Sequence, residues 1–316
     1  MTELTPKDGK DTDRLIERVL LAHVEEQRRA RRWGLVFKLI LIVYLGGVLV
    51  VSQAPFKGIW NPESEMKTAV IDVAGVIAPG QPANADTLID ALREASEDSK
   101  VKGILLRMNS PGGSPVQSQA VYEEIRRLKA EKPELPIVAV VADLCASGCY
   151  YIAAAADKIF VSEASVVGSI GVIMGSFGFV ETLKTLGIER RIMTAGEHKA
   201  LLDPFAPVDP VAKAHMQGLI NQVHQQFIDA VKAGRGPRLK ETPEMFSGLV
   251  WNGREGIRLG LADEIGSDRS VAETVIGAKK RVNFNPEEGV FERLSRRMGT
   301  EVALAFLSTL QNVGLR

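Results

Sequence analysis

In this 316-residue chain, Ser147 is a candidate nucleophile because it lies at a predicted junction between a strand and a helix. Residues 144–149 (LCASGC) follow an apolar run at 137–142 that is typical of a buried strand, and small residues that favour a helix come next. A serine at such a junction lies at the carboxyl edge of a sheet, where its hydroxyl can serve as a nucleophile. Gly148 adds an N–H at the helix start, which can stabilise an oxyanion. The alternative is that Ser147 only caps the helix, and its neighbours do not form the G-x-S-x-G elbow of α/β-hydrolases.

A glycine-rich segment at residues 109–114 (NSPGGS) is the second candidate. It directly follows an apolar run that ends at Met108, and a helical pattern follows it. The two glycines let the backbone turn sharply and expose N–H groups near the helix start. Such donors suit a phosphate or a developing oxyanion, although the P-loop pattern is absent. A tight turn without chemistry is the alternative.

A serine nucleophile needs a base, and the chain has four histidines. His23 precedes an apolar segment that could cross a membrane, and His215 and His224 lie on a long predicted helix. His198 is adjacent to Lys199 in residues 194–205 (TAGEHKALLDPF). A lysine accepts a proton only when neutral, which requires desolvation, and the apolar residues after Lys199 can supply it. A solvated surface lysine is the alternative.

The elements that position these residues alternate between strands and helices. Strands are predicted at residues 68–77, 101–108, 137–142, 158–161 and 189–193. Helices are predicted at residues 85–95, 115–129, 147–156, 180–186 and 210–232. This alternation predicts βαβ units in an α/β fold with a mainly parallel, covered sheet, in one domain at residues 66–278.

The N-terminal part of the chain predicts its location. Lysine and arginine total 39, as do aspartate and glutamate, so no basic excess favours a nucleic-acid partner. Residues 33–52 are mostly Leu, Ile and Val, with Lys38 as the only charge, and are long enough to cross a bilayer. Arginines cluster at residues 28–32, just before this segment. The positive-inside rule therefore predicts a cytoplasmic segment at 1–32, a single transmembrane signal anchor at 33–52 and an extracytoplasmic remainder, joined by a linker at 53–65.

Two alternatives to an uncleaved anchor are a buried core helix and a cleaved signal peptide. Ser52 and Ala54 form a small-x-small pattern that a signal peptidase could cut. The polar region before the apolar stretch would be 32 residues long, however, which exceeds the usual length. We therefore expect the anchor to remain, with the chain in the inner (cytoplasmic) membrane.

Several segments, in this order, resemble the motifs of the signal peptide peptidase A (SppA) family. They are residues 109–114 (NSPGGS), 146–153 (ASGCYYIA), 167–172 (VGSIGV), 196–205 (GEHKALLDPF) and 250–267, which contain GLADEIG. The likeness covers about residues 66–267 and includes a preceding membrane anchor, as in the short, single-domain members. The family is similar in fold to the ClpP and crotonase group, so the resemblance implies a ClpP/crotonase-like domain.

The resemblance also implies roles for individual residues. Ser147 matches the nucleophile, and Lys199 matches the general base of a Ser–Lys dyad. Ser169 matches a hydroxyl that orients the lysine, and the amides of Gly113 and Gly148 match the oxyanion donors. The resemblance also implies a homo-oligomeric ring, because short members of the family assemble in this way. In such a ring the dyad could form within one subunit or between residues of two subunits.

The implied activity is that of a membrane-anchored serine endopeptidase that needs no metal or organic cofactor. Its substrates would be cleaved signal peptides and other hydrophobic peptides at the membrane. A crotonase-like acyl-CoA enzyme is an alternative with the same glycine loop, disfavoured because acyl-CoA is cytosolic. A non-catalytic membrane scaffold of the same fold is another.

Two further features have weaker implications. Cys145 and Cys149 are the only cysteines and flank the serine. They cannot build a disulfide scaffold, and unpaired cysteines commonly fill small apolar spaces, so we expect filling rather than redox control or a cysteine nucleophile. A C-terminal tail at 279–316 carries an amphipathic pattern at 288–310, which suits a membrane surface, another protomer or the chain's own domain.

Overall fold

The computed structural model describes residues 29, 31–46 and 65–286, and the chain divides into two compact units between residues 63 and 64. In the first unit, residues 31–46 form a helix with exposed side chains. Within these described ranges, no helix is both long and apolar enough to span a membrane. The end of the predicted anchor at 47–52 and the predicted tail helix at 288–310 lie outside the described residues.

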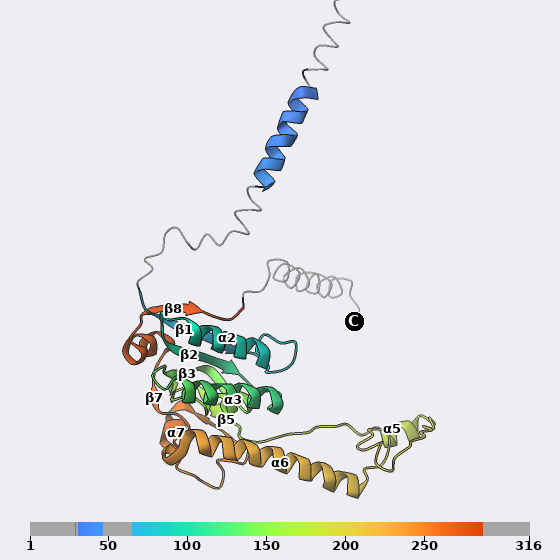
Figure 1. Ribbon diagram of the computed structural model, residues 1–316. Coiled ribbons are helices and arrows are strands. Elements are labelled where there is room, and N and C mark those ends of the chain that lie inside the picture. The colour runs from blue at the N-terminus through green and yellow to red at the C-terminus, as the bar shows by residue number, and fades with distance from the viewer. Residues whose placement is uncertain (1–28, 30, 47–64, 287–316) are drawn as a thin grey trace, which may run out of the picture. The chain divides into compact units, whose positions relative to one another are not determined.

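The second unit is built on an eight-stranded sheet (Figure 1). Its strands are β1 (Lys67–Ala74), β2 (Val101–Ser110), β3 (Ile137–Ala146), β4 (Lys158–Val161), β5 (Val166–Gly168), β6 (Val250–Asn252), β7 (Glu264–Ile265) and β8 (Lys280–Asn283). The order is β6-β5-β3-β2-β1-β8, with β4 pairing β3 and β7. Among the described strands, β5 and β6 pair antiparallel and the other pairs are parallel, which confirms the mainly parallel α/β sheet. The sheet continues to β8, just past the predicted domain end at residue 278.

Helices cover both faces of this sheet. They are α2 (Ala85–Glu97), α3 (Pro115–Glu131), α4 (Gly148–Ala153), α5 (Val180–Thr185), α6 (Pro210–Arg235), α7 (Gly253–Arg258) and α8 (Asp268–Val271), with short helices η2 (Gly236–Arg238) and η3 (Ala272–Ile276). Ile104 and Leu106 of β2 enter the main core with residues of α2, α3, α4 and α6. Leu105 enters a smaller core with residues of α8 and η3. Because successive side chains of a strand point to opposite faces, a strand buried on both faces reads as a continuous apolar run.

Helix α6 joins this packed body to a projecting segment. The Asp209 carboxylate accepts hydrogen bonds from two backbone amides of the first turn, and Pro210 occupies the first helical position. Near the other end, Phe227 is buried, and Arg235 is fully buried and forms a two-point ion pair with Asp263. The C-terminal half of α6 is therefore held in the core, whereas most of its N-terminal half is partly or fully exposed.

Residues 171–209, here called the arm, extend away from the sheet and include α5 (Figure 1). No residue of α5 is buried. The predicted helix at 180–186 is present, but the predicted strand at 189–193 is wrong, because these residues are exposed and irregular. β-rich composition forms a strand only where another strand is available to pair, and none of the described strands pairs with this segment.

Candidate active site

Ser147 occupies a sharp turn between β3 and α4. Its backbone angles are φ 53° and ψ −124°, a conformation that serine rarely adopts and that costs about 1–3 kcal/mol. The turn is held by hydrogen bonds from the Ser147 amide to the Gly168 carbonyl (2.9 Å) and from the Tyr151 amide to the Ser147 carbonyl (3.0 Å). The Ser147 side chain makes no capping hydrogen bond and is half-buried. Helix capping therefore does not account for this serine.

The glycine-rich loop packs directly against this turn. Gly112 has a φ of 97°, which favours glycine, and a Cβ there would lie 2.7 Å from the Gly148 amide nitrogen and 2.8 Å from the Ser147 Cβ. A Cβ on Gly113 would lie only 2.1 Å from the Ile77 carbonyl oxygen. Both glycines are thus required by close backbone approach, which brings the loop onto the serine turn.

The two amides predicted as oxyanion donors lie beside one another. A Cβ on Gly148 would be 3.2 Å from the Gly113 nitrogen, so the two loops are in contact at these residues. The neighbouring amides are engaged, since Ile77 donates to the Gly112 carbonyl and Ser114 donates to the Ile77 carbonyl. In the described part of the chain, outside the hydrogen bonds within helices and strands, neither the Gly113 nor the Gly148 amide donates to a backbone carbonyl. The structure therefore brings Ser147, Gly113 and Gly148 together.

Known proteins are similar to this chain in sequence. The model of peptidase family S49 matches residues 129–282. A putative protease of Synechocystis sp. is 31% identical over 226 residues, which make up 71% of this chain and 78% of that protein. The chain belongs to peptidase family S49. The expected membership of the SppA group of peptidases is thereby confirmed.

Two other relatives of this S49 chain match over only part of their own length. A putative signal peptide peptidase SppA of Enterococcus faecium is 29% identical over 225 residues, or 69% of this chain and 65% of that protein. The Na(+)/H(+) antiporter NhaA of Brucella abortus is 39% identical over 235 residues, or 72% of this chain and 32% of that protein. The chain thus spans about a third of the antiporter and just under two thirds of the SppA relative.

A small pocket adjoins Ser147 in this S49 domain. It is lined by Gly113, Pro115, Gln119, Ser147, Gly148, Tyr151, Gly171, Val172, Val223, Gln226 and Phe227. The rings of Tyr151 and Phe227 stack with centroids 4.8 Å apart, and Tyr122 meets Tyr151 edge-on at 5.3 Å. Burial raises the pKa values of the Tyr122 and Tyr151 hydroxyls, so these rings present neutral, mainly apolar surface. The pocket suits an apolar side chain next to the serine.

Ser169 lies at the end of β5, one residue after the carbonyl that accepts the Ser147 amide. Its φ is 52°, and its amide donates to the Leu249 carbonyl at 2.7 Å. Ser169 is therefore fixed by the sheet edge next to the serine turn. The sequence signal for this position was the resemblance alone, since a serine after a glycine is otherwise typical of any turn.

Lys199 lies in the arm, which extends away from the sheet that carries Ser147 (Figure 1). It is exposed, and its backbone amide donates to the Gly196 carbonyl at 3.1 Å. It does not line the pocket beside Ser147. In the described residues its ammonium group makes no hydrogen bond or ion pair. The desolvated environment that a lysine base needs is not formed around it within one copy of the chain.

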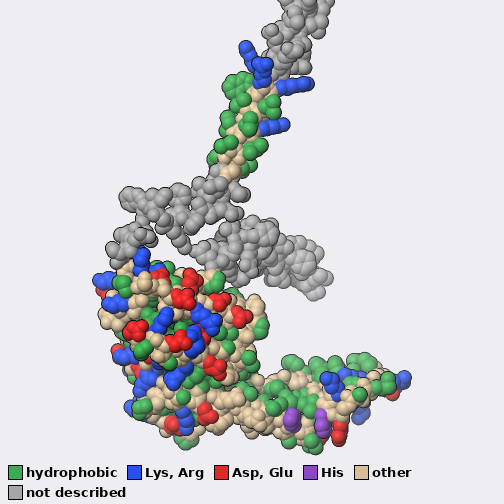
Figure 2. Space-filling model, viewed as in Figure 1, with side chains coloured by type: hydrophobic (Ala, Val, Ile, Leu, Met, Phe, Trp, Pro, Cys, Tyr) green, Lys and Arg blue, Asp and Glu red, His purple; other side chains and the backbone are tan. Residues whose placement is uncertain are grey.

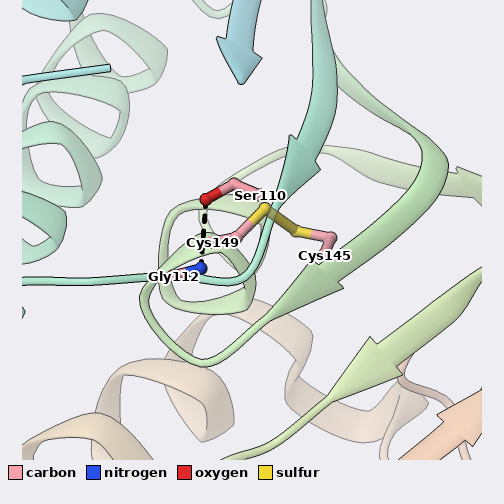
Figure 3. The surroundings of a disulfide bond; sticks show 4 residues. All are labelled: Ser110, Gly112, Cys145 and Cys149. Carbon is pink, nitrogen blue, oxygen red and sulfur yellow. Dashed lines mark hydrogen bonds between the residues drawn. A yellow bond between two sulfur atoms is a disulfide. The ribbon is translucent and has the colours of Figure 1, made fainter. Parts of the chain in front are cut away.

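The expectation that the cysteines are unpaired is wrong. Cys145 and Cys149 are fully buried, as expected of small apolar filling, but they form a disulfide (Figure 3). The turn at Ser147 brings their Cα atoms within 5.1 Å, a separation that a disulfide spans. The usable sequence signal was their spacing of four residues across a sharp turn.

The described residues hold no group of three or more His, Cys, Asp or Glu side chains placed to bind a metal ion. Glu124, a carboxylic acid whose pKa is strongly lowered, lies on α3 and does not line the pocket beside Ser147. Arg127 and Arg93 donate hydrogen bonds to the Glu124 carboxylate on α3 and lower its pKa to about 2. This group stabilises the contact between α2 and α3 rather than the serine site.

Proposed function

We propose that this chain is a membrane-anchored serine endopeptidase that degrades cleaved signal peptides and other hydrophobic peptides. The observation that carries the proposal is the position of Ser147. Its hydroxyl makes no helix-capping hydrogen bond, its backbone lies in a strained turn, and it is next to Gly113, Gly148 and an apolar pocket. Backbone strain at such a residue persists only where the surroundings hold it, and it is concentrated at functional sites. Membership of a peptidase family supports the same conclusion.

The proposed reaction uses Lys199 as the general base. A neutral Lys199 amine takes the Ser147 proton as the hydroxyl oxygen attacks a peptide carbonyl, and the amide donors of Gly113 and Gly148 stabilise the oxyanion. The C–N bond then breaks, the amine product leaves with the proton from Lys199, and an acyl-enzyme ester remains. Water, activated by the same lysine, hydrolyses this ester. Ser169 would orient the lysine by a hydrogen bond.

We propose further that a second copy of the chain supplies Lys199, within a homo-oligomeric ring. Lys199 is exposed and apart from Ser147 of its own chain, so one copy leaves the site without its base. The arm also exposes apolar side chains, including Ile173 (96%) and Met193 (98%), and Figure 2 shows such side chains gathered along it. Exposed apolar surface of this kind is typical of a protein–protein contact. Covering the arm with another copy would also desolvate Lys199.

The proposed location is a single-pass anchor in the inner membrane, with the peptidase domain outside the cytoplasm. The arginines before residue 33 and the apolar run after it support this orientation. The Cys145–Cys149 disulfide also supports it, because disulfides persist in oxidising compartments. A domain held beside the bilayer would meet peptides released from membrane segments.

The test is labelling and complementation with the full chain. A serine-reactive phosphonate should label Ser147, and both Ser147→Ala and Lys199→Ala should lower peptide cleavage by at least about 10³-fold. Lys184→Ala, an exposed arm lysine, is the matched control and should retain wild-type activity. Absence of both labelling and cleavage in the wild type would refute the peptidase proposal and favour the scaffold.

Mixing Ser147→Ala with Lys199→Ala subunits tests where the dyad forms. If the lysine comes from a neighbouring copy, mixed assemblies contain some sites with both residues, so activity returns to a substantial fraction of the wild-type value. If the mixture stays as inactive as each variant alone, while subunit exchange is verified by mass spectrometry, the dyad does not form between copies.

A further inference from the structure

The Cys145–Cys149 disulfide closes a five-residue loop, and Ser147 is the central residue of that loop. Cys145 is the second-last residue of strand β3, and Cys149 is the second residue of helix α4. The bridge therefore joins the strand before the serine to the helix after it. Both cysteines belong to the main core, so each end of the bridge is fixed by packing.

The backbone of Ser147 needs such a restraint. Its conformation is unfavourable for a residue with a side chain, and only surroundings that hold both flanks can maintain it. At Ser147 itself, the backbone amide donates a hydrogen bond to the Gly168 carbonyl, and the carbonyl accepts one from the Tyr151 amide. The disulfide adds a covalent cross-link between the second residue before the serine and the second residue after it.

The disulfide is also connected, through strand pairing and a hydrogen bond, to the glycine-rich loop at residues 109–114. Cys145 pairs with Ser110 of β2, and the buried Ser110 hydroxyl accepts a hydrogen bond from the Gly112 amide at 3.0 Å (Figure 3). Gly112 in turn approaches Ser147 and Gly148 so closely that a methyl group would not fit between them. A small shift of the turn would therefore change the distance between Ser147 and the donors of the opposite loop.

We propose that this disulfide is a positioning element for the Ser147 nucleophile and a redox-modification site whose opening by a thiol reductant lowers the rate of the chemical step. The inference rests on the proposed function of Ser147. Opening the disulfide takes two electrons and two protons, which a dithiol reductant supplies. The S–S bond between the cysteines breaks and leaves two thiols, while the reductant is oxidised and forms its own S–S bond. Both cysteines are fully buried, so the reaction with a reductant is slow in the folded chain.

The expected effect is local. Disulfides that close long loops restrict the unfolded chain most, and this loop is one of the shortest possible. Loss of the bridge should therefore change the melting temperature little. Misplacement of a reacting group by a fraction of an ångström to 1 Å can lower a rate by up to about 10²-fold. The pocket that receives the substrate side chain is formed mostly by other residues, so KM should be nearly unchanged.

The experiment compares the oxidised full chain, the same protein reduced with dithiothreitol, and the double variant Cys145→Ala/Cys149→Ala. Thiol titration under denaturing conditions should find no free thiol before reduction and two after it. We expect kcat and the rate of Ser147 labelling to fall about 10-fold to 100-fold in the reduced and double-variant proteins, with KM within about twofold. Reoxidation should restore the wild type, and the double variant should not respond to dithiothreitol.

The control is Tyr150→Phe, which removes a buried hydrogen bond from the same helix to the Leu261 carbonyl (2.8 Å). It should lower the melting temperature and leave kcat unchanged, which separates stability from positioning. Hydrogen–deuterium exchange of residues 145–151 should rise on reduction, and this measurement does not depend on activity. Unchanged exchange, unchanged kcat in an active enzyme, or two free thiols after oxidative purification would overturn the inference. A wild type that shows the exchange difference but neither cleaves nor is labelled would refute the peptidase proposal alone.

Discussion

The turn at Ser147 and the arm at residues 171–209 differ in how far one copy of the chain fixes their geometry. Around Ser147 the neighbouring residues are buried, the backbone is strained, and a disulfide and two loops in van der Waals contact surround the hydroxyl. In the arm, α5 has no buried residue and Lys199 is exposed. The proposed nucleophile and its proposed oxyanion donors are thus arranged within one chain, whereas the geometry around the proposed base would depend on what packs on the arm.

Because of this difference, substitutions in the body and in the arm should affect the protein in different ways. Substitutions in the body act through folding or through the fixed geometry of the serine, and their effects should not depend on protein concentration. If the arm packs on another copy as proposed, substitutions at its exposed positions should act mainly through association, since most of its residues are exposed within one copy.

Asp263→Asn should have the largest effect on stability. The carboxylate pairs at two points with Arg235, which is fully buried, and its removal leaves that guanidinium charge without a counter-charge. Breaking a buried pair in this way costs about 3–5 kcal/mol of unfolding free energy, measurable by denaturant titration. Glu163→Gln, which breaks the exposed pair with Arg254, is the matched control and should cost less than about 1 kcal/mol. Equal costs would contradict the burial argument.

Gly112→Ala should disable the serine site from the opposite loop. The added methyl group would lie 2.7 Å from the Ala146 carbonyl oxygen and the Gly148 nitrogen, at a φ of 97° that disfavours alanine. Displacement of the oxyanion donors should lower kcat/KM by about 10²–10³-fold. Gly178→Ala in the arm meets nothing within 4 Å and should leave kcat/KM unchanged. A Gly112 variant with wild-type kinetics would show that this loop does not contribute to the reaction.

Glu124→Gln should lower stability in a pH-dependent way. Hydrogen bonds from Arg127 and Arg93 lower the pKa of Glu124 from 4.5 to about 2, so its contribution is present above pH 4.5 and is lost as the pH falls toward 2. We expect a loss of about 1–3 kcal/mol near pH 7, because the arginines are partly exposed, and a smaller difference from wild type as the pH approaches 2. Glu123→Gln, its exposed neighbour, should change stability by less than about 0.5 kcal/mol. A pH-independent difference between Glu124→Gln and wild type would contradict this assignment.

Met193→Ser should have the smallest effect on folding and a visible effect on assembly. The side chain is 98% exposed, so the unfolding free energy of the dilute chain should change by less than about 0.5 kcal/mol. If the arm packs on another copy, sedimentation should show weaker association and cleavage should fall with it. Intact assembly and activity in this variant would place the contact elsewhere on the arm.

Local sequence patterns predicted most of the body and little of the arm. The strands and helices from 67 to 161 and helix α6 agree closely with prediction, because alternating burial and helical periodicity are imposed by the core. The strand predicted at 189–193 failed because pairing, not composition, decides whether a strand forms.

The candidate site was predictable to a similar extent. The junction at Ser147 and the glycine-rich segment were predicted as separate candidates. The structure brings them into contact, because the carboxyl ends of the parallel strands β2 and β3 meet at one edge of the sheet. The disulfide was missed because composition counts cysteines but does not reveal that a turn brings them together. Lys199 could be named from its motif, but a single chain does not determine its surroundings.

Helix α6 has a mechanical consequence. Its 26 residues span about 39 Å, with the end at Arg235 locked in the core and the end at Asp209 carrying the arm. It therefore acts as a lever whose pivot is the ion pair with Asp263: a tilt of about 5° at the pivot moves the far end by about 3 Å. A reacting amine must be placed to well under 1 Å. If Lys199 acts in a neighbouring copy as proposed, the ion pair between Arg235 and Asp263 would therefore affect how accurately the arm places it.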